Sequence, residues 1–384
     1  MTAFEFATAN RIIFGDGCAR AAAGLAAAHG SRVLLVVACG PGRGGWLVDD
    51  LRRLGVDVAL LDVDREPDVA LAAEGAVLAR ERAIDAIVGL GGGSALDAAK
   101  AIAALATNRG DPLDYLEVVG AGRPISATPL PVIAVPTTAG TGSEVTRNAV
   151  LRVPERRVKV SLRSPLMLPR AAIVDPLLTH DLPPATTAAT GLDALTQLIE
   201  PFMSLRANPM TDAFCREGMA RAARSLRRVC EDGRDAVARS DMALASLFGG
   251  LALANAGLGA VHGFAASIGG MAGAPHGAVC AALLPHVMAS NLRALRAAHA
   301  GQALDRAAEI GRVLTGRADA GADDAVAWLA ETVSQVRIPR LSELGVTPAD
   351  VPAIAELAQA SSSMKGNPVA FTLEELVAIL NTAL

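Results

Sequence analysis

Short apolar runs alternate with Ala-rich stretches of helical periodicity through about the first half of the chain. Helical patterns cover residues 45–54 and 68–82, and runs rich in Val, Ile and Leu cover residues 32–37, 56–61, 84–90 and 131–136. Strands that alternate with helices in this way are typical of a parallel sheet covered by helices. We therefore predict an α/β fold for residues 1–180.

The pattern changes near residue 181. Helical periodicities continue from there to the end, and β-rich runs almost disappear. Two proline-containing connections, Asp175-Pro176 and Leu182-Pro183-Pro184, accompany the change, and proline favours such boundaries. We predict a domain boundary here, with an α/β domain over residues 1–180 and an all-helical domain over residues 181–384.

The most apolar part of the second half runs from Met242 to Leu292 and contains no Asp, Glu, Lys or Arg. Glycines, Asn255 and Pro275 interrupt it, and a dense Leu/Ile/Phe run is missing, so we predict a buried helical core and not a membrane-spanning helix. His262 and His276 lie within it. A buried neutral imidazole is either a hydrogen-bonded core residue or a metal ligand.

A glycine loop follows one of the predicted strands directly. Residues 84–90 lead into Gly91-Gly92-Gly93-Ser94, which opens a helix. Glycines at such a junction let the backbone approach a ligand closely, and the amides of a helix N-terminus attract an anion. The loop predicts a phosphate-binding site, with a tight turn without ligand as the alternative. Its spacing is neither GxGxxG nor that of a Walker loop.

Two further stretches carry candidate chemistry. The strand at 131–136 ends in a loop of hydroxyls and glycines, Thr137 to Thr146, at the place where α/β sheets bind ligands. Residues 186–202 form a predicted helix whose N-cap we expect the threonines to supply. Asp193 and Gln197 lie one turn apart on that helix. Together with His262 and His276 they can hold a cation, whereas a solvated Asp/Gln pair is the alternative.

Composition narrows the function classes. The chain has 384 residues, 52% of them hydrophobic and 19% charged, with a net charge of −4, as expected of a water-soluble protein of two domains. Basic clusters with interleaved aromatics are missing, so we expect no nucleic acid or membrane partner. The N-terminal residues resemble no secretion signal. The five cysteines, among them Cys39 and Cys280, have no metal-binding spacing, and we expect them to be ordinary small apolar residues in a reducing compartment. We predict a cytoplasmic protein.

Seven sequence motifs resemble those of a known enzyme family and follow one another in the same order. They are GGGSALDAAK from Gly91, PTTAGTGSEVT from Pro136, DPLLT from Asp175, TGLDALTQLIEPF from Thr190, NPMTDAF from Asn208, VHGFAASIGG from Val261 and PHGAVCAALLP from Pro275. The sequence resembles the iron-containing (group III) alcohol dehydrogenase family. The resemblance implies the dehydroquinate synthase-like fold, in which an α/β dinucleotide-binding domain precedes an all-helical domain for metal and substrate.

The resemblance also implies roles for individual residues. The glycine loop would hold the cofactor pyrophosphate, and the remaining expected cofactor contacts are Asp97, Thr137, Thr138, Thr141, Ser143, Lys159, Cys39 and Arg43. The family holds a divalent metal with one Asp and three His. The matching positions here are Asp193, Gln197, His262 and His276, and we assign a catalytic role to the two histidines.

Three departures from the family pattern change the expectations. Gln197 stands at a histidine position, so the metal is Fe²⁺ or Zn²⁺ or is weakly held. Ala266 stands where many members have a proton-relaying histidine. Cys39 stands where many members have an aspartate that binds the ribose of NAD. Arg43, which follows soon after, is a candidate to bind the 2′-phosphate of NADP, so the cofactor is either NAD or NADP.

We predict reversible hydride transfer between a nicotinamide and a small alcohol or carbonyl compound, with a divalent metal as the Lewis acid. One alternative is a maleylacetate-reductase-like enzyme with little metal dependence, for which Lys159, Arg163 and Lys365 are the available cations. Zinc-dependent relatives such as glycerol dehydrogenase are another. A catalytically inactive nucleotide-binding protein is the alternative of a different class. We expect a homodimer, for which the apolar stretch Phe4 to Phe6 is a candidate pairing strand.

Overall fold

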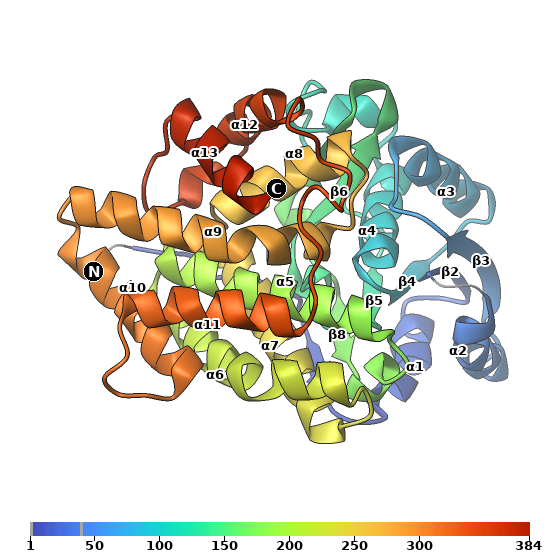
Figure 1. Ribbon diagram of the computed structural model, residues 1–384. Helices are drawn as coiled ribbons and strands as arrows, with labels where there is room; N and C mark the ends of the chain where they lie inside the picture. The colour runs from blue at the N-terminus through green and yellow to red at the C-terminus, as the bar shows by residue number, and fades with distance from the viewer. Residues whose placement is uncertain (1–2, 39–40) are drawn as a thin grey trace. The chain divides into compact units, whose positions relative to one another are not determined.

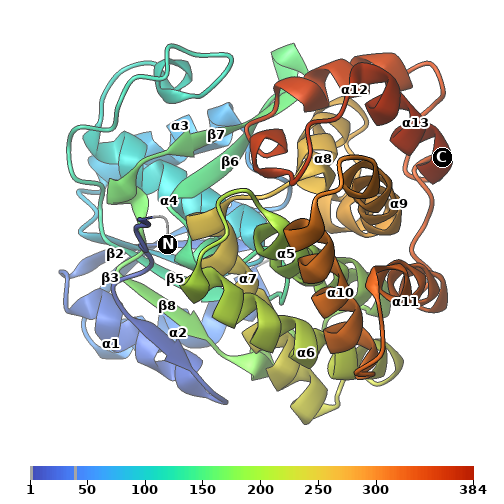
Figure 2. The same cartoon turned by 90° about the vertical axis from the view of Figure 1, so that its left-hand side faces the viewer.

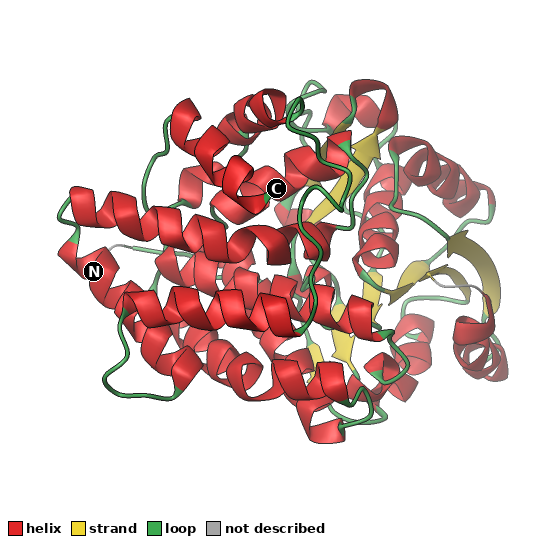
Figure 3. Cartoon of the chain, in the orientation of Figure 1, coloured by secondary structure: helices red, strands yellow, loops and turns green. Residues whose placement is uncertain are grey.

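The computed structural model describes residues 3–38 and 41–384, and its chain divides into two compact units. One unit comprises Thr8–Thr138 and Gly142–Thr179. The other comprises His180–Leu384 together with Ala139–Thr141 and the chain up to Ala7. Figure 3 shows that the strands are confined to the first unit, whereas the second is built from helices and loops.

The first unit contains a parallel sheet of six strands in the order β1-β8-β5-β4-β2-β3 (Figure 1). The strands are β1 (Ile12–Phe14), β2 (Arg32–Ala38), β3 (Asp57–Val63), β4 (Ala86–Gly91), β5 (Val132–Pro136) and β8 (Ala171–Val174). The helices of this unit are α1 (Ala21–Ala27), α2 (Pro41–Arg53), α3 (Val69–Glu81) and α4 (Gly93–Thr107).

Alternate residues of each strand pack on opposite faces of the sheet. In β2, Val33, Leu35 and Val37 join the core formed with α1 and α2. Leu34 and Val36 join the core formed with α3 and α4. Figure 2 shows these two pairs of helices on opposite sides of the strands. The helices on both faces explain why the strand runs are almost continuously apolar.

The second unit is all-helical in its described part. Its helices are α5 (Pro184–Met203), α6 (Pro209–Glu231), α7 (Ala236–Ala256), α8 (Ala260–Met271), α9 (His276–Ala297), α10 (Gly301–Thr315), α11 (Ala322–Gln335), α12 (Val351–Ala360) and α13 (Leu373–Ala383). The predicted fold class, a parallel α/β region followed by an all-helical region, is therefore confirmed.

Among the described residues, α7 and α9 are long and apolar enough to cross a membrane by composition alone. Their most apolar windows are 67% and 78% buried inside the protein, respectively. Both helices pack in the core of the helical unit, with Leu251 and Leu284 almost fully buried. Core helices of this kind satisfy the same length and hydropathy criteria as membrane spans.

One local expectation is wrong. The threonines do not cap α5, which begins at Pro184 after Pro183 with no side-chain cap; the hydroxyls of Thr190 and Thr196 donate to carbonyls one turn earlier. Phe4 to Phe6 is coil in the single chain, and its pairing across a homodimer stays a prediction. The antiparallel hairpin of β6 (Asn148–Val153) and β7 (Val158–Arg163) was not expected, because its polar residues interrupt the apolar pattern.

Candidate functional site

Three helices of the helical unit bring a group of metal-binding side chains together. Asp193 comes from α5, His262 from the first turn of α8, and His276 and Cys280 from the first two turns of α9. One candidate ligand atom from each of the four residues lies within 4.8 Å of the others. Asp193 Oδ1 is 3.4 Å from His262 Nε2 and 3.8 Å from His276 Nε2. We call these four residues the α5/α8/α9 cluster.

Several polar atoms here are buried without a hydrogen-bond partner. Asp193 Oδ1, His262 Nε2 and Gln197 Oε1 make no hydrogen bond with the described residues, although the first two lie 3.4 Å apart, and all three side chains are almost fully buried. An unpaired buried polar atom costs about 1–3 kcal/mol. Three such atoms on residues that the family resemblance assigns to a metal indicate that a cation compensates this cost.

Glu200, which the sequence analysis did not identify, fixes the orientation of His262. Its Oε2 lies 2.6 Å from His262 Nδ1, and its Oε1 accepts the Val261 N–H at 2.7 Å. In the neutral ring, a proton on Nδ1 that is donated to this carboxylate leaves the lone pair of Nε2 free to bind a cation beside Asp193. Carboxylates hold metal-binding histidines in this tautomer. The signal was present in the sequence, since Glu200 follows Asp193 by two helical turns.

The charges around the cluster favour a cation. Burial raises the pKa of Asp193, but the neighbouring His276 and His262 bring it below its usual value. Burial lowers the pKa of His262, while Cys280 and Glu200 raise it well above 6.5. Two carboxylates thus face the almost fully buried imidazole of His262, and such a site attracts positive charge. The donor set of oxygen, nitrogen and sulfur atoms fits a divalent transition metal.

Cys280 was classed from the sequence as an ordinary small apolar residue, and its position corrects that interpretation. Its Sγ lies 3.6 Å from His276 Nε2, and its side chain is fully buried. The four-residue spacing from His276 puts both side chains on one face of α9. That spacing was visible in the sequence, but only the packing of α9 against α5 and α8 makes it significant.

The glycine loop of the other unit has the geometry of an anion-binding helix start. Gly92 is the N-cap of α4 and no side chain caps the helix, so the first amides are available to a ligand. Gly91 has a φ of 154°, and a Cβ there would lie 2.8 Å from the Cβ atoms of Ala38 and Ala95. Only glycine therefore fits where β4 ends beside β2, which is also where the strand order reverses.

A buried polar network connects the hydroxyl-rich loop to α4. Asp97 accepts from Ser143 Oγ at 2.5 Å and from the Val150 N–H at 3.0 Å. Lys100, which is buried, pairs with Asp97 at 3.1 Å and donates to Ser143 O and Thr146 Oγ1. Asp97 thus positions the loop, and the sequence analysis missed Lys100. A contact of Asp97 with the cofactor stays a prediction.

The other expected cofactor residues occupy varied environments. Thr137 is buried after β5, Thr138 lies where a Cβ on Gly92 would meet it at 3.2 Å, and Thr141 belongs to the helical unit. Lys159 on β7 is paired with Glu66 at 2.6 Å, and Arg163 pairs with Glu117 at 3.4 Å, so neither is an unpaired cation. Arg43 is exposed at the start of α2, and Cys39 lies outside the described residues.

Comparison with known families agrees with this geometry. The model of the iron-containing alcohol dehydrogenase family matches residues 9–176, and the C-terminal model of the Fe-containing alcohol dehydrogenase family matches residues 187–384. The chain belongs to the iron-containing alcohol dehydrogenase family. It is accordingly an oxidoreductase that acts on CH–OH groups, and the family implies a nicotinamide dinucleotide and a divalent metal.

Similar proteins extend over most of the chain. Alcohol dehydrogenase 4 of Saccharomyces cerevisiae is 38% identical over 89% of this chain and 87% of its own length. The 1,3-propanediol dehydrogenase of Klebsiella pneumoniae is 40% identical over 87% of this chain and 85% of its own length. A crystal structure of a 1,3-propanediol oxidoreductase superimposes with a TM-score of 0.92 at 35% identity and covers both chains completely.

These relatives confirm the predicted family and the predicted alcohol dehydrogenase activity, with small alcohols and aldehydes as the substrate class. They do not favour the maleylacetate-reductase-like or inactive alternatives. The two nearly contiguous family matches also account for the collinear order of the seven motifs.

Proposed function

We propose that this member of the family transfers hydride between NAD(P)H and a small aldehyde at a divalent metal held by the helical unit. The main evidence is a group of three buried polar atoms without a hydrogen bond, one each on Asp193, Gln197 and His262. A bound cation supplies Lewis-acid polarisation of the substrate oxygen. The relatives named 1,3-propanediol dehydrogenase suggest short, uncharged alcohols as substrates of this chain.

The chain's own residues have separable tasks in this proposal. Asp193, His262 and His276 hold the cation, and Glu200 keeps the His262 ring in its binding tautomer. The uncharged surroundings from Met242 to Leu292 exclude water and strengthen the electrostatic interactions of the site. In the other unit, the amides at the start of α4 bind the cofactor pyrophosphate.

The cofactor choice is a finer proposal. Arg43 is exposed in the first turn of α2, four residues after Cys39, the position at which the family resemblance leads us to expect an NAD-binding aspartate. An arginine there pairs with a 2′-phosphate, so we propose that the enzyme uses NADPH as well as NADH. The cytoplasmic location and the homodimer stay predictions.

The first experiment measures aldehyde-dependent oxidation of NADH and of NADPH by chelator-stripped protein, before and after addition of Fe(II) or Zn(II). We expect stripping to abolish turnover and one of the metals to restore it. His262→Ala should stay inactive with either metal, because it removes a ligand. His286→Ala, which alters a histidine of α9 outside the cluster, is the matched control and should behave as wild type.

Full activity of the stripped protein would contradict the metal mechanism and favour the metal-independent alternative. Oxidation of NADH alone, with no measurable use of NADPH, would contradict only the cofactor proposal. Binding of both nucleotides without turnover of any small aldehyde would contradict the proposed reaction itself.

A further inference from the structure

The fourth metal-binding position of this chain is chemically unusual. The family uses a third histidine where this sequence has Gln197, and a neutral amide oxygen is a weaker donor than imidazole for a transition metal. A thiol stands one helical turn after His276, in the position of Cys280. The loss of one good donor thus coincides with the presence of another in the same cluster.

We propose that the Cys280 thiolate is a ligand of the divalent cation and completes the site with Asp193, His262 and His276. The inference deepens the proposed function and rests on its metal centre. It keeps the number of strong protein donors at the four that the family employs, and the substrate oxygen would bind by expanding the coordination from four to five.

Distances in the cluster match a tetrahedral centre. With typical zinc bond lengths, adjacent nitrogen and oxygen ligands lie about 3.4 Å apart, and adjacent nitrogen and sulfur ligands lie about 3.6 Å apart. The observed separations are 3.4 Å and 3.8 Å from Asp193 Oδ1 to the two imidazole Nε2 atoms. The separation from Cys280 Sγ to His276 Nε2 is 3.6 Å. These three edges of the tetrahedron are already close to their expected lengths.

The surroundings of Cys280 indicate how the ligand forms. Cys280 is fully buried, and its Sγ lies 3.6 Å from His276 Nε2. When a divalent cation binds, the S–H bond breaks, the proton leaves to solvent and a metal–sulfur bond forms. A sulfur donor makes the site softer and favours Zn²⁺ over Fe²⁺ relative to a site with only nitrogen and oxygen donors.

Cobalt(II) tests the proposal directly, since a thiolate ligand gives cobalt an intense near-ultraviolet charge-transfer band. Stripped wild-type protein loaded with one equivalent of cobalt should show this band. Cys280→Ser should lose it while still binding cobalt through the other three residues. Cys230→Ser, which changes a half-buried cysteine of α6 outside the cluster, should retain it. Gln197→Ala should also retain the band.

Zinc X-ray absorption of the wild-type protein gives a second measurement that needs no variant. We expect a sulfur shell near about 2.3 Å beside nitrogen and oxygen at about 2.0–2.1 Å. The proposal would be overturned by bound zinc without a sulfur shell or by bound cobalt without the charge-transfer band. It would also be overturned by a band that survives Cys280→Ser or by the lack of stoichiometric metal binding.

The outcome is independent of the reaction. An enzyme that is active with its metal but lacks the sulfur signature retains the proposed function and loses this inference. A protein that binds metal through sulfur but does not turn over aldehydes would support this inference and contradict the proposed function.

Discussion

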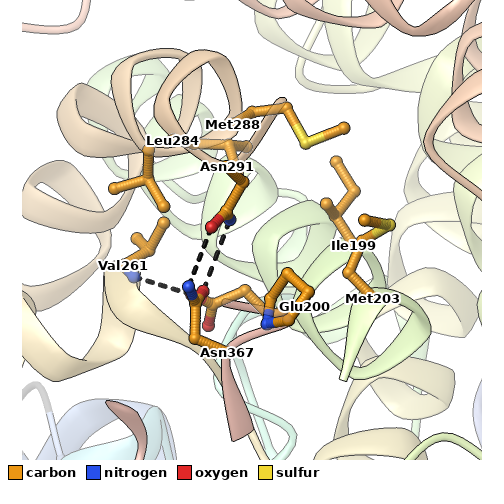
Figure 4. Close-up of a pocket in the computed structure, with 10 residues that line it drawn as sticks. Ile199, Glu200, Met203, Val261, Leu284, Met288, Asn291 and Asn367 are labelled. Atoms are coloured by element: carbon orange, nitrogen blue, oxygen red, sulfur yellow. Dashed lines mark hydrogen bonds between the residues drawn. The ribbon is translucent and has the colours of Figure 1, made fainter. Parts of the chain in front are cut away.

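At the scale of single residues, Glu200 connects the metal cluster to the polar interior of the helical unit. Figure 4 shows it with Asn291 and Asn367 at a cavity of about 10 Å³, which is room for about one water molecule. Asn367 exchanges hydrogen bonds with Asn291 and accepts the Ala260 N–H at the start of α8. The start of the helix that carries His262 is therefore held by Glu200 of α5 and Asn367 of the C-terminal segment, and Asn291 of α9 positions Asn367.

Glu200→Ala should lower the metal affinity by about 10–100-fold, the usual effect of removing a carboxylate that orients a histidine ligand. A competition titration against a chelator measures this change. Glu200→Gln retains one acceptor oxygen and should recover part of the affinity. Glu356→Ala, an exposed glutamate on α12, is the matched control. Unchanged affinity in Glu200→Ala would show that the His262 orientation does not depend on this carboxylate.

At the scale of elements, two helix N-termini contribute to the candidate binding sites. The helix α4 begins at a glycine N-cap with uncapped amides, and α9 begins at His276 after Pro275. The first turn of a helix is well positioned because its backbone is anchored by the turns that follow.

Gly91→Ala tests the close approach at the end of β4. The added methyl would meet the Cβ atoms of Ala38 and Ala95 at 2.8 Å, and the φ of 154° is unfavourable for alanine. We expect the free energy of unfolding to fall by about 1–3 kcal/mol and NAD(P)H binding to weaken. Guanidinium unfolding and nucleotide fluorescence titration measure the two effects.

Gly24→Ala provides the control for this substitution in the same unit. Gly24 lies exposed on α1 with open space around its missing Cβ, so alanine there should stabilise the protein by up to about 1 kcal/mol. If Gly91→Ala were to unfold at the wild-type denaturant concentration and bind nucleotide equally well, the close packing of β4 against β2 would be disproved.

At the scale of the whole molecule, each unit has a core of its own. A large apolar cluster fills the helical unit, and separate clusters line the two faces of the sheet. The candidate metal donors all belong to the helical unit, whereas the glycine loop belongs to the α/β unit. We therefore expect the metal to stabilise the core of the helical unit and the nucleotide to stabilise the core of the α/β unit.

Metal removal should accelerate hydrogen exchange in α5, α8 and α9 and leave β2, β4 and β5 unchanged, because the cation binds only the native helical unit. A metal concentration of 100 times Kd corresponds to about 2.7 kcal/mol of stabilisation. Hydrogen exchange followed by mass spectrometry, with and without chelator, measures the difference by segment. Equal acceleration in both units would contradict a metal site confined to the three helices.

Much of the fold and part of the candidate site could be predicted from the local pattern of residues along the chain. The apolar runs of β2 and β4 and the Ala-rich periods between them identified a parallel sheet, because helix and strand periodicities depend only on neighbouring residues. The glycine loop was equally readable, since a strand, three glycines and a helix define an anion-binding turn without further information. Asp193 and His262 were recognisable by residue type and by the family resemblance.

Tertiary packing decided the rest. Which helix faces meet is not encoded in the spacing along any one helix, so the sequence did not place Cys280 beside Asp193 or Glu200 behind His262. The same reason hid Lys100, whose burial depends on a loop more than 40 residues away. Periodicity along the chain thus determined the elements, whereas the docking of α5, α8 and α9 determined which polar atoms are buried together and what they can bind.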